Sequence, residues 1–261
     1  MKFLKLFLIT LLLGGCSFKG LVISNLDWYI VNRMDKQLHL YSKQEDELKR
    51  EVQKYLKAQV GKVVEIGSHF KNLETANFQI KRENEFFRKS FGYFEKSFRP
   101  ILIKMLISLD QTQRERFIKS FEEKTKEYGK ELSERETKNY ANRFKYFFGE
   151  LSEEQKLVIT KNLSELKSDS TEWLKQREVL LADLKKVLLQ KSEALSLERE
   201  LDQIYERYFQ RRYQSSKGKI MLKVIPAIMA TLKPEQKARF IDLKKEVDEW
   251  VSIYSDTYSL K

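Results

Sequence analysis

The sequence has little of several residue types that specialised folds require. It contains one cysteine, two histidines, nine glycines and three prolines in 261 residues. A single cysteine excludes a disulfide framework and a cysteine-rich zinc site, because both need several thiols. Two histidines leave little for a histidine-based catalytic or metal centre. The scarcity of glycine and proline argues against a β-sandwich, a barrel or a disordered linker, since each of these is rich in turns or breakers.

What the chain does have is the composition of a helical protein. Hydrophobic residues make up 41% of the sequence, with 17 Phe and 12 Tyr, so a core can form and disorder is excluded. Of the 38 acidic residues 28 are Glu, and Lys, Leu and Glu dominate the body of the chain; all three favour helices. No alternating strand pattern of useful length and no Asn-Gly or Asp-Gly hairpin signal occurs. The sequence therefore predicts an all-α fold.

Apolar residues recur at helical spacing along the chain. Three such stripes contain Leu48, Val52 and Leu56; Phe117, Phe121 and Tyr128; and Phe240, Leu243, Val247, Trp250 and Tyr254. Strict heptads do not persist, which favours helices folded back on one another over a long coiled coil. We expect an elongated bundle of antiparallel, fairly long helices with short turns. Breaks are expected near Gly20, Gly61, Gly67-Ser68, Gly149, residues 168–170 and residues 215–218.

The first sixteen residues have the pattern of a bacterial lipoprotein signal peptide. Lys2 and Lys5 precede an apolar run over residues 6–13, which is shorter than the roughly 18–20 residues that cross a bilayer. Two glycines then precede Cys16, and small residues before a cysteine resemble the lipobox, in which the thiol receives a diacylglycerol and the chain is cut before it. The alternative is an ordinary secretory signal followed by a free or buried thiol.

The predicted processing defines the domain organisation. Loss of Lys2 and Lys5 lowers the formal net charge from +12 to +10. Two or three acyl chains at Cys16 suffice for stable membrane attachment. Ser17 in place of an aspartate resembles the sorting pattern for the periplasmic face of the outer membrane in Gram-negative bacteria. We expect a signal peptide over residues 1–15, a lipidated tether over 16–24, and over 25–261 a single helical domain or two closely packed halves that meet near 149–152.

A Leu-x-x-x-Gln motif occurs four times. Its leucine and glutamine lie at Leu40 and Gln44, Leu109 and Gln113, Leu151 and Gln155, and Leu232 and Gln236. The spacings of 69, 42 and 81 residues do not form a regular solenoid repeat. An apolar residue follows each leucine by eight positions: Leu48, Phe117, Ile159 and Phe240.

The physical content of the motif is a helix start. In the second and third copies Asp110 and Ser152 can accept from first-turn amides while the glutamine reaches back, which forms a capping box. In the fourth copy Pro234 suits the first helical position. We therefore interpret the copies as turns between antiparallel helices, each with its leucine as an apolar anchor. A ligand-binding role for the glutamines is the alternative.

Basic and aromatic residues gather near residue 210. Tyr205, Tyr208, Phe209 and Tyr213 lie among five basic residues: Arg207, Arg211, Arg212, Lys217 and Lys219. Such a cluster can hold nucleic acid by stacking and phosphate contacts. A protein outside the cytoplasm would instead meet anionic lipids, lipopolysaccharide and peptidoglycan carboxylates. We expect no nucleic-acid partner, and the open alternatives are an anionic-surface site and a solvated helix face.

Trp28 and Tyr29 lie shortly after Cys16, and two interpretations are open. Amphipathic aromatic side chains are favoured at a membrane interface. They can equally begin the core, and we favour this second interpretation. Its basis is a helical stripe that continues through Leu26, Ile30 and Met34.

The chain resembles two families at these residues. Its Leu-x-x-x-Gln helix starts are similar to the LTxxQ motifs of the periplasmic Spy and CpxP chaperones, which are small, all-helical and cradle-shaped. A broader resemblance, over nearly the whole mature chain, is to an uncharacterised family of bacterial lipoproteins, catalogued as a domain of unknown function. Its members share a lipobox, a segment like Asn-Leu-Asp-Trp at residues 25–28, an Arg-Pro-x-Leu segment like residues 99–102, and similarly ordered motif copies. This resemblance implies an all-helical, outer-membrane-associated lipoprotein and brings no activity with it.

Patterns that would mark an enzyme are not evident in the sequence. His39 and His69 lack a partner at metal-ligand spacing, and no P-loop, Gly-x-Ser-x-Gly or Gly-x-Gly-x-x-Gly motif occurs. We therefore expect no enzymatic activity, metal or cofactor. The leading hypothesis is a non-catalytic lipoprotein, tethered at Cys16 to the periplasmic face of the outer membrane, that acts as a binding or envelope-structure module. The alternatives are a Spy-like holdase for unfolded envelope proteins and an enzyme that acts on envelope polymers.

Overall fold

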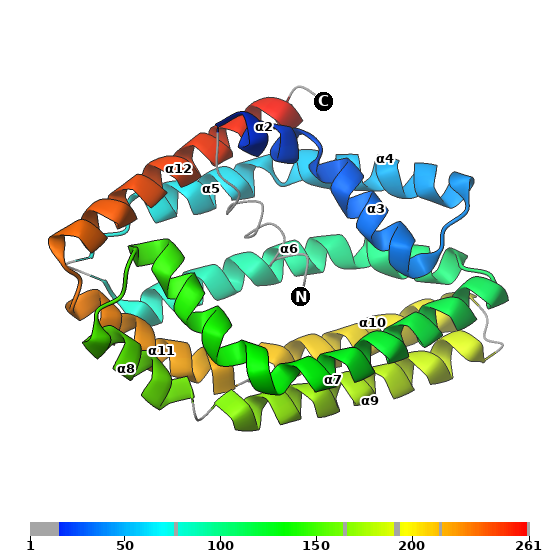
Figure 1. Ribbon diagram of the computed structural model, residues 1–261. Coiled ribbons are helices and arrows are strands. Elements are labelled where there is room, and N and C mark those ends of the chain that lie inside the picture. Colours follow the sequence, from blue (N-terminus) through cyan, green and yellow to red (C-terminus); the bar gives the residue numbers. More distant parts are fainter. Residues whose placement is uncertain (1–15, 76–77, 164–165, 191–193, 214–215, 260–261) are drawn as a thin grey trace. The chain divides into compact units, whose positions relative to one another are not determined.

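The computed structural model describes residues 16–75, 78–163, 166–190, 194–213 and 216–259, and every element within these residues is a helix (Figure 1). The all-α prediction is therefore confirmed. The helices are α2 (Cys16–Ser24), α3 (Leu26–Leu38), α4 (Ser42–Ala58), α5 (Val60–Lys71), α6 (Ile80–Ser108), α7 (Gln111–Phe148), α8 (Glu153–Leu163), α9 (Leu166–Leu189), α10 (Ala194–Tyr213), α11 (Ser216–Ala230) and α12 (Pro234–Ser259). Helices α6, α7, α9 and α12 have 29, 38, 24 and 26 residues, against an average of about 11–12 in globular proteins.

The chain divides into two compact units, and two helices contribute to both. Unit 1 contains the described residues up to Leu73, together with 89–109 and those from Lys244 onward. Unit 2 contains 74–88 and 110–243. Helices α6 and α12 therefore each run from one unit into the other. Residues 149–152, where the sequence suggested a junction between halves, lie inside unit 2.

Unit 1 is built around one face of α4. Leu48, Val52 and Leu56 are all buried, and the first two have no exposed surface. Helix α3 packs against α4. The C-terminal half of α12 joins α4 as well, because the hydroxyl of Tyr254 donates to the carbonyl of Leu56 at 2.8 Å. The apolar stripe predicted over residues 48–56 is therefore the centre of this unit.

Unit 2 is an assembly of long helices that lie side by side. Helix α9 packs against both α7 and α10, and in Figure 1 it runs in the opposite direction to each of them. The shorter helix α8 packs against α11. Leu188, Leu197 and Ile228 have at most 1% of their surface exposed and lie in the core of this unit.

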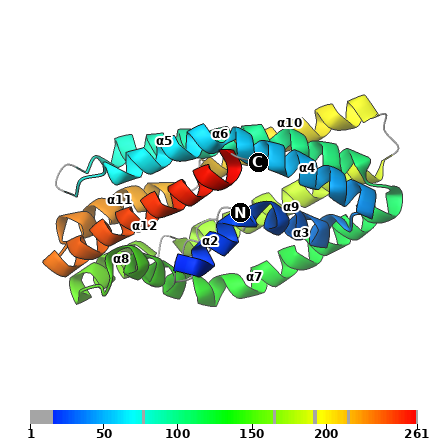
Figure 2. The same cartoon turned by 90° about the horizontal axis from the view of Figure 1, so that it is seen from above.

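The glycines do not all mark turns, although the sequence suggested breaks at several of them. Gly149 does end α7, with a backbone φ of +74° that favours glycine. Gly20 and Gly67 instead lie inside α2 and α5. At Gly67 a Cβ atom would lie 2.5 Å from Cγ2 of Val251, so the missing side chain allows close approach of α12, which lies beside α5 in Figure 2. The break expected near Gly61 falls at Gln59, between α4 and α5.

The two serine-rich breaks have separate outcomes. Residues 168–170 lie inside α9, so a break there was wrong. Serine is only slightly less favourable than other polar residues inside a helix, and neighbouring good helix formers outweigh it. Of residues 215–218, Ser216, Lys217 and Gly218 lie inside α11, so a break at these three was wrong, and residue 215 lies outside the described part of the chain.

Candidate functional site

The four Leu-x-x-x-Gln motifs share one local geometry. Each glutamine Oε1 accepts a hydrogen bond, at 2.9–3.0 Å, from the backbone N–H three residues earlier: Tyr41, Asp110, Ser152 and Lys233. In the second and third copies the cap side chain also accepts from the glutamine N–H, at 2.8 and 3.2 Å, which completes the boxes at Asp110 and Ser152. Pro234 is the first residue of α12. The copies therefore begin α4, α7, α8 and α12.

In unit 2 the glutamines of the third and fourth copies bind each other. Gln155 Nε2 donates to Gln236 Oε1 at 3.0 Å, and Gln236 Nε2 donates to Gln155 Oε1 at 2.9 Å. Each amide also donates to the carbonyl directly before the other motif's leucine, Gln155 to Thr231 at 3.1 Å and Gln236 to Glu150 at 2.8 Å. The two turns therefore hold each other by a nearly symmetric set of hydrogen bonds, although 81 residues separate the glutamines.

These contacts use the whole hydrogen-bonding capacity of both side chains. A glutamine amide offers two N–H donors and an oxygen with two lone pairs. In Gln155 and Gln236 each oxygen accepts from a backbone N–H and from the other amide, while each nitrogen donates to a carbonyl and to the other amide. Only 1% and 3% of their surface is exposed. The structural interpretation is therefore favoured over ligand binding, because a ligand would have to break bonds that these buried groups need.

The first copy makes a similar contact within unit 1. Gln44 Nε2 donates to the carbonyl of Ser108 at 2.7 Å, directly before Leu109. Leu109 is buried and Leu40 is half-buried. The remaining motif side chains are buried as well: Gln113, Leu151 and Leu232. So are the four apolar residues eight positions after each leucine, namely Leu48, Phe117, Ile159 and Phe240.

The predicted lipid-attachment residue lies at the start of a helix that is fixed to unit 1. Cys16 is the first described residue and belongs to α2, and its side chain is outside the described part of the chain. Near the other end of α2 the carbonyl of Ile23 accepts from the hydroxyl of Tyr258 at 3.0 Å. Burial raises the pKa of Tyr258 to about 12, so this hydroxyl remains a donor even at a pH above the ordinary tyrosine value of about 10. The segment predicted as a tether is therefore helical.

Helix α3 buries one face and exposes the other. Leu26, Ile30 and Met34 are buried, and Tyr29 is half-buried. Trp28, in contrast, has 59% of its surface exposed, so the expectation that it begins the core was wrong. The reason is geometric, because a residue two positions from both Leu26 and Ile30 points about 200° away around a helix.

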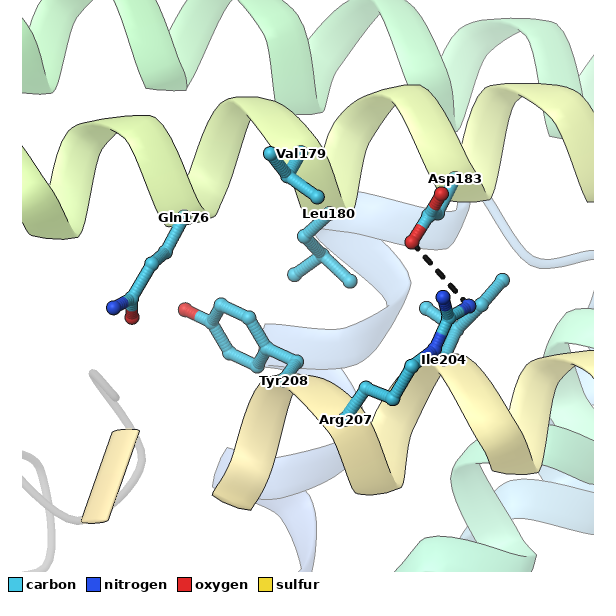
Figure 3. A pocket seen from close by; sticks show the side chains of 7 residues that line it. All are labelled: Gln176, Val179, Leu180, Asp183, Ile204, Arg207 and Tyr208. Carbon is cyan, nitrogen blue, oxygen red and sulfur yellow. Dashed lines mark ion pairs between the residues drawn. The ribbon is translucent and has the colours of Figure 1, made fainter. Parts of the chain in front are cut away.

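Only one side chain of the predicted basic cluster lies in the described part of the chain. Arg207 on α10 pairs with Asp183 on α9, with 3.4 Å between Nη2 and Oδ2 (Figure 3). This ion pair borders a solvent-open pocket that Tyr208, Leu180 and Gln176 also line. Because both partners are solvated, the pair contributes little to stability, but it offsets the charge of Arg207. The other side chains of the cluster lie outside the described residues: Arg211, Arg212, Lys217 and Lys219.

Arg177 on α9 contacts two residues of α7, and the sequence did not predict this contact. Arg177 Nε donates to Thr125 Oγ1 at 2.8 Å, and the guanidinium lies 4.2 Å from the ring centroid of Phe121. Burial lowers the pKa of Arg177 below its ordinary value. An aromatic face compensates part of the lost hydration of the cation. No sequence signal connects these residues, because Thr125 and Arg177 are 52 positions apart.

The described residues contain neither a candidate membrane-spanning helix nor a candidate metal site. None of the helices there combines the length and the apolar character that a bilayer crossing requires. In the same residues no three His, Cys, Asp or Glu side chains are placed to hold a metal ion. His39 is exposed and closes α3 with a left-handed backbone, at φ 52°, and His69 is half-buried in α5.

Comparison with known proteins identifies a family and no characterised relative. No curated protein and no solved structure matches the chain. One family model matches residues 54–214, which is more than half of the chain and includes the second and third Leu-x-x-x-Gln motifs. The chain therefore belongs to DUF6279, a family of unknown function.

Proposed function

We propose that this protein is a non-catalytic lipoprotein, anchored through Cys16 at the periplasmic face of the outer membrane, and that it acts as a binding or envelope-structure module. One observation carries the proposal beyond the sequence pattern. Cys16 belongs to helix α2, and Tyr258 fixes the other end of this helix to unit 1 through the carbonyl of Ile23. Acyl chains at Cys16 would therefore join the folded protein without a flexible linker, which suits a module held at a defined position on a membrane.

The glutamine network supports the structural part of this proposal. In the third and fourth Leu-x-x-x-Gln motifs the glutamines hold two turns together. Gln155 and Gln236 are fully paired by hydrogen bonds, two of which they make with each other. Polar groups that are buried and satisfied in this way stabilise a unique arrangement of helices. A module that must present a fixed surface gains from such rigidity.

Acylation is tested by replacing Cys16 with Ser in the full-length precursor. In cells fed an alkyne-bearing fatty acid, the unchanged protein should become labelled and fractionate with the outer membrane. The Cys16→Ser variant should be unlabelled and absent from the outer-membrane fraction. Ser17→Ala is the matched control, because it alters the adjacent residue without removing the thiol, and it should remain labelled. Labelling that survives Cys16→Ser would refute the proposed anchor.

A holdase chaperone is the second candidate function. Unit 2 exposes more than half of three large apolar side chains, which is chemistry that an unfolded client can contact: Leu157, Leu195 and Ile241. The soluble Cys16→Ser form should then suppress light scattering by an aggregating client, and replacing the three residues with Ser should weaken that suppression. No suppression at equimolar protein would exclude this role.

A further inference from the structure

The N-terminal helices present an apolar stripe to solvent. Leu21 in α2 has 61% of its surface exposed and Trp28 in α3 has 59%. Leu21 and Trp28, called the apolar stripe below, lie in separate helices that meet at Asn25, whose backbone is not helical, with φ −114° and ψ 22°. Tyr29 N donates to the carbonyl of Asn25 at 3.0 Å, which is the first hydrogen bond of α3. The Asn25 side chain also donates to the carbonyl of Leu21, at 2.7 Å.

Contacts on the opposite face prevent this stripe from turning inward. The carboxylate of Asp27 is buried and accepts from Gln53 Nε2 at 2.7 Å, which fixes α3 to α4. Tyr258 fixes α2 through the carbonyl of Ile23. The side chains that α3 buries in unit 1 are apolar: Leu26, Ile30, Val31, Met34 and Leu38. Turning Trp28 toward the protein would break all of these contacts. The packing of α3 therefore keeps this side chain in solvent.

The stripe lies beside the proposed acylation site. Leu21 and Trp28 follow Cys16 by five and twelve residues. Twelve residues of one straight helix span about 18 Å, and two helices that meet at an angle span about this distance or less. Cys16 and Leu21 belong to α2 and Trp28 to α3, so a membrane surface that holds the acyl chains lies close to both exposed apolar side chains. Tryptophan and leucine are suited to headgroup depth. The exposed Lys36, about two turns further along α3 and about 80° around it from Trp28, has a long side chain that can extend to lipid phosphates.

We infer that the exposed face of α2 and α3, marked by Leu21 and Trp28, inserts into the headgroup region of the bilayer that holds the Cys16 acyl chains. The inference rests on the proposed lipid anchor. An anchor at one point leaves a protein free to rotate on the membrane. A second contact at Trp28 removes that freedom and sets the orientation of unit 1 on the lipid surface.

Fluorescence of a single tryptophan tests this contact directly. The acylated protein would carry Trp173→Phe and Trp250→Phe, so that Trp28 is the remaining tryptophan. In vesicles of phosphatidylethanolamine and phosphatidylglycerol its emission should shift to the blue. Lipids brominated near the headgroup should quench it more than lipids brominated at the chain ends. The matched control adds Trp28→Phe and Tyr93→Trp, which moves the probe to α6 at a site of similar exposure, 46%, where quenching should be much weaker.

The readouts separate this inference from the proposed anchor. Mass spectrometry first establishes whether Cys16 is acylated. A protein without acyl chains would overturn the anchor and the inference together. An acylated, vesicle-bound protein whose Trp28 emission is neither shifted nor quenched would overturn the inference alone. Equal quenching at Trp28 and at Tyr93→Trp would also overturn it, because the contact would not be specific to α2 and α3.

Discussion

A buried amide side chain destabilises a protein unless both of its ends are paired, and the glutamines of the third and fourth motifs meet this condition through each other. Within its own motif, Gln155 caps the start of α8 at Ser152. Across the unit, it binds Gln236 and the carbonyl of Thr231. One residue type at one spacing therefore begins a helix and also joins two turns that are distant in sequence.

Replacing Gln155 with Ala should lower the free energy of unfolding by about 2–3 kcal/mol, because it removes the cap at Ser152 and leaves groups of Gln236 unpaired. Gln203→Ala, at an exposed position of α10, should change it by less than about 0.5 kcal/mol. In a double-mutant cycle with Gln236→Ala the coupling should be about 1 kcal/mol. Urea denaturation measures these values, and strictly additive effects would contradict the reciprocal pair.

Tyr258 gives unit 1 a pH dependence above pH 10. Burial raises its pKa to about 12 in the folded protein, against about 10 for an unfolded tyrosine. Between these values the folded state binds more protons than the unfolded state, so the free energy of unfolding should fall as pH rises from 10 to 12. The stabilisation is fully present below pH 10.

Tyr258→Phe should reduce that slope and should cost about 1 kcal/mol below pH 10, through loss of the hydrogen bond to Ile23. Part of the slope should remain, because burial also raises the pKa of Tyr254. Denaturation at a series of pH values provides the measurement. An identical slope in Tyr258→Phe and the unchanged protein would show that the phenol of Tyr258 does not titrate as described.

At the scale of a helix, residues that usually interrupt helices are used here inside them. Pro100 lies within α6 and Pro226 within α11. Gly67 lies within α5, where it faces Val251 of α12. Local preference disfavours all three positions by about 1 kcal/mol for glycine and about 3 kcal/mol for proline. Tertiary packing therefore determines these helices more than local preference does.

Two alanine substitutions in α5 should have opposite effects. Gly67→Ala should lower the free energy of unfolding by about 1–2 kcal/mol, because the new Cβ overlaps the stiff, branched side chain of Val251. Gly61→Ala meets no atom within 4 Å and should raise it by up to about 1 kcal/mol. Adding Val251→Ala should relieve part of the Gly67→Ala defect. Equal effects of the two alanines on thermal unfolding would refute the close approach.

At the scale of the whole molecule, the formal net charge of +12 becomes +10 if the first fifteen residues are removed. A charge of this size attracts anionic surfaces over about one Debye length, roughly 8–10 Å at physiological salt. Acidic residues are mixed with basic ones along most of the chain, and Arg207 is already paired with Asp183. Surface binding is therefore best tested at Arg211 and Arg212, the two arginines that follow Arg207 in the predicted basic cluster.

The soluble Cys16→Ser form should bind phosphatidylglycerol vesicles, and added salt should weaken the binding. Replacing Arg211 and Arg212 with Ala should weaken it by roughly fivefold per residue, which corresponds to about 1 kcal/mol for each. Arg116→Ala with Lys119→Ala, two exposed basic residues of α7, is the charge-matched control and should have a smaller effect. Sedimentation of vesicles measures the bound fraction, and equal losses in both pairs would indicate a diffuse charge effect in place of a site.

The sequence by itself determined the helical class and the helix starts, because both depend on residues within about one turn of each other. The capping of Ser152 by Gln155 and the place of Pro234 at the start of α12 are local in this sense. Tertiary structure alone decided what lies across from each motif, why Gly67 lacks a side chain, and that Trp28 faces outward. These outcomes depend on the packing of segments that are far apart in the chain, such as α5 with the C-terminal half of α12. A local pattern shows that a helix has an apolar side, whereas only the packed helices show which atoms cover it.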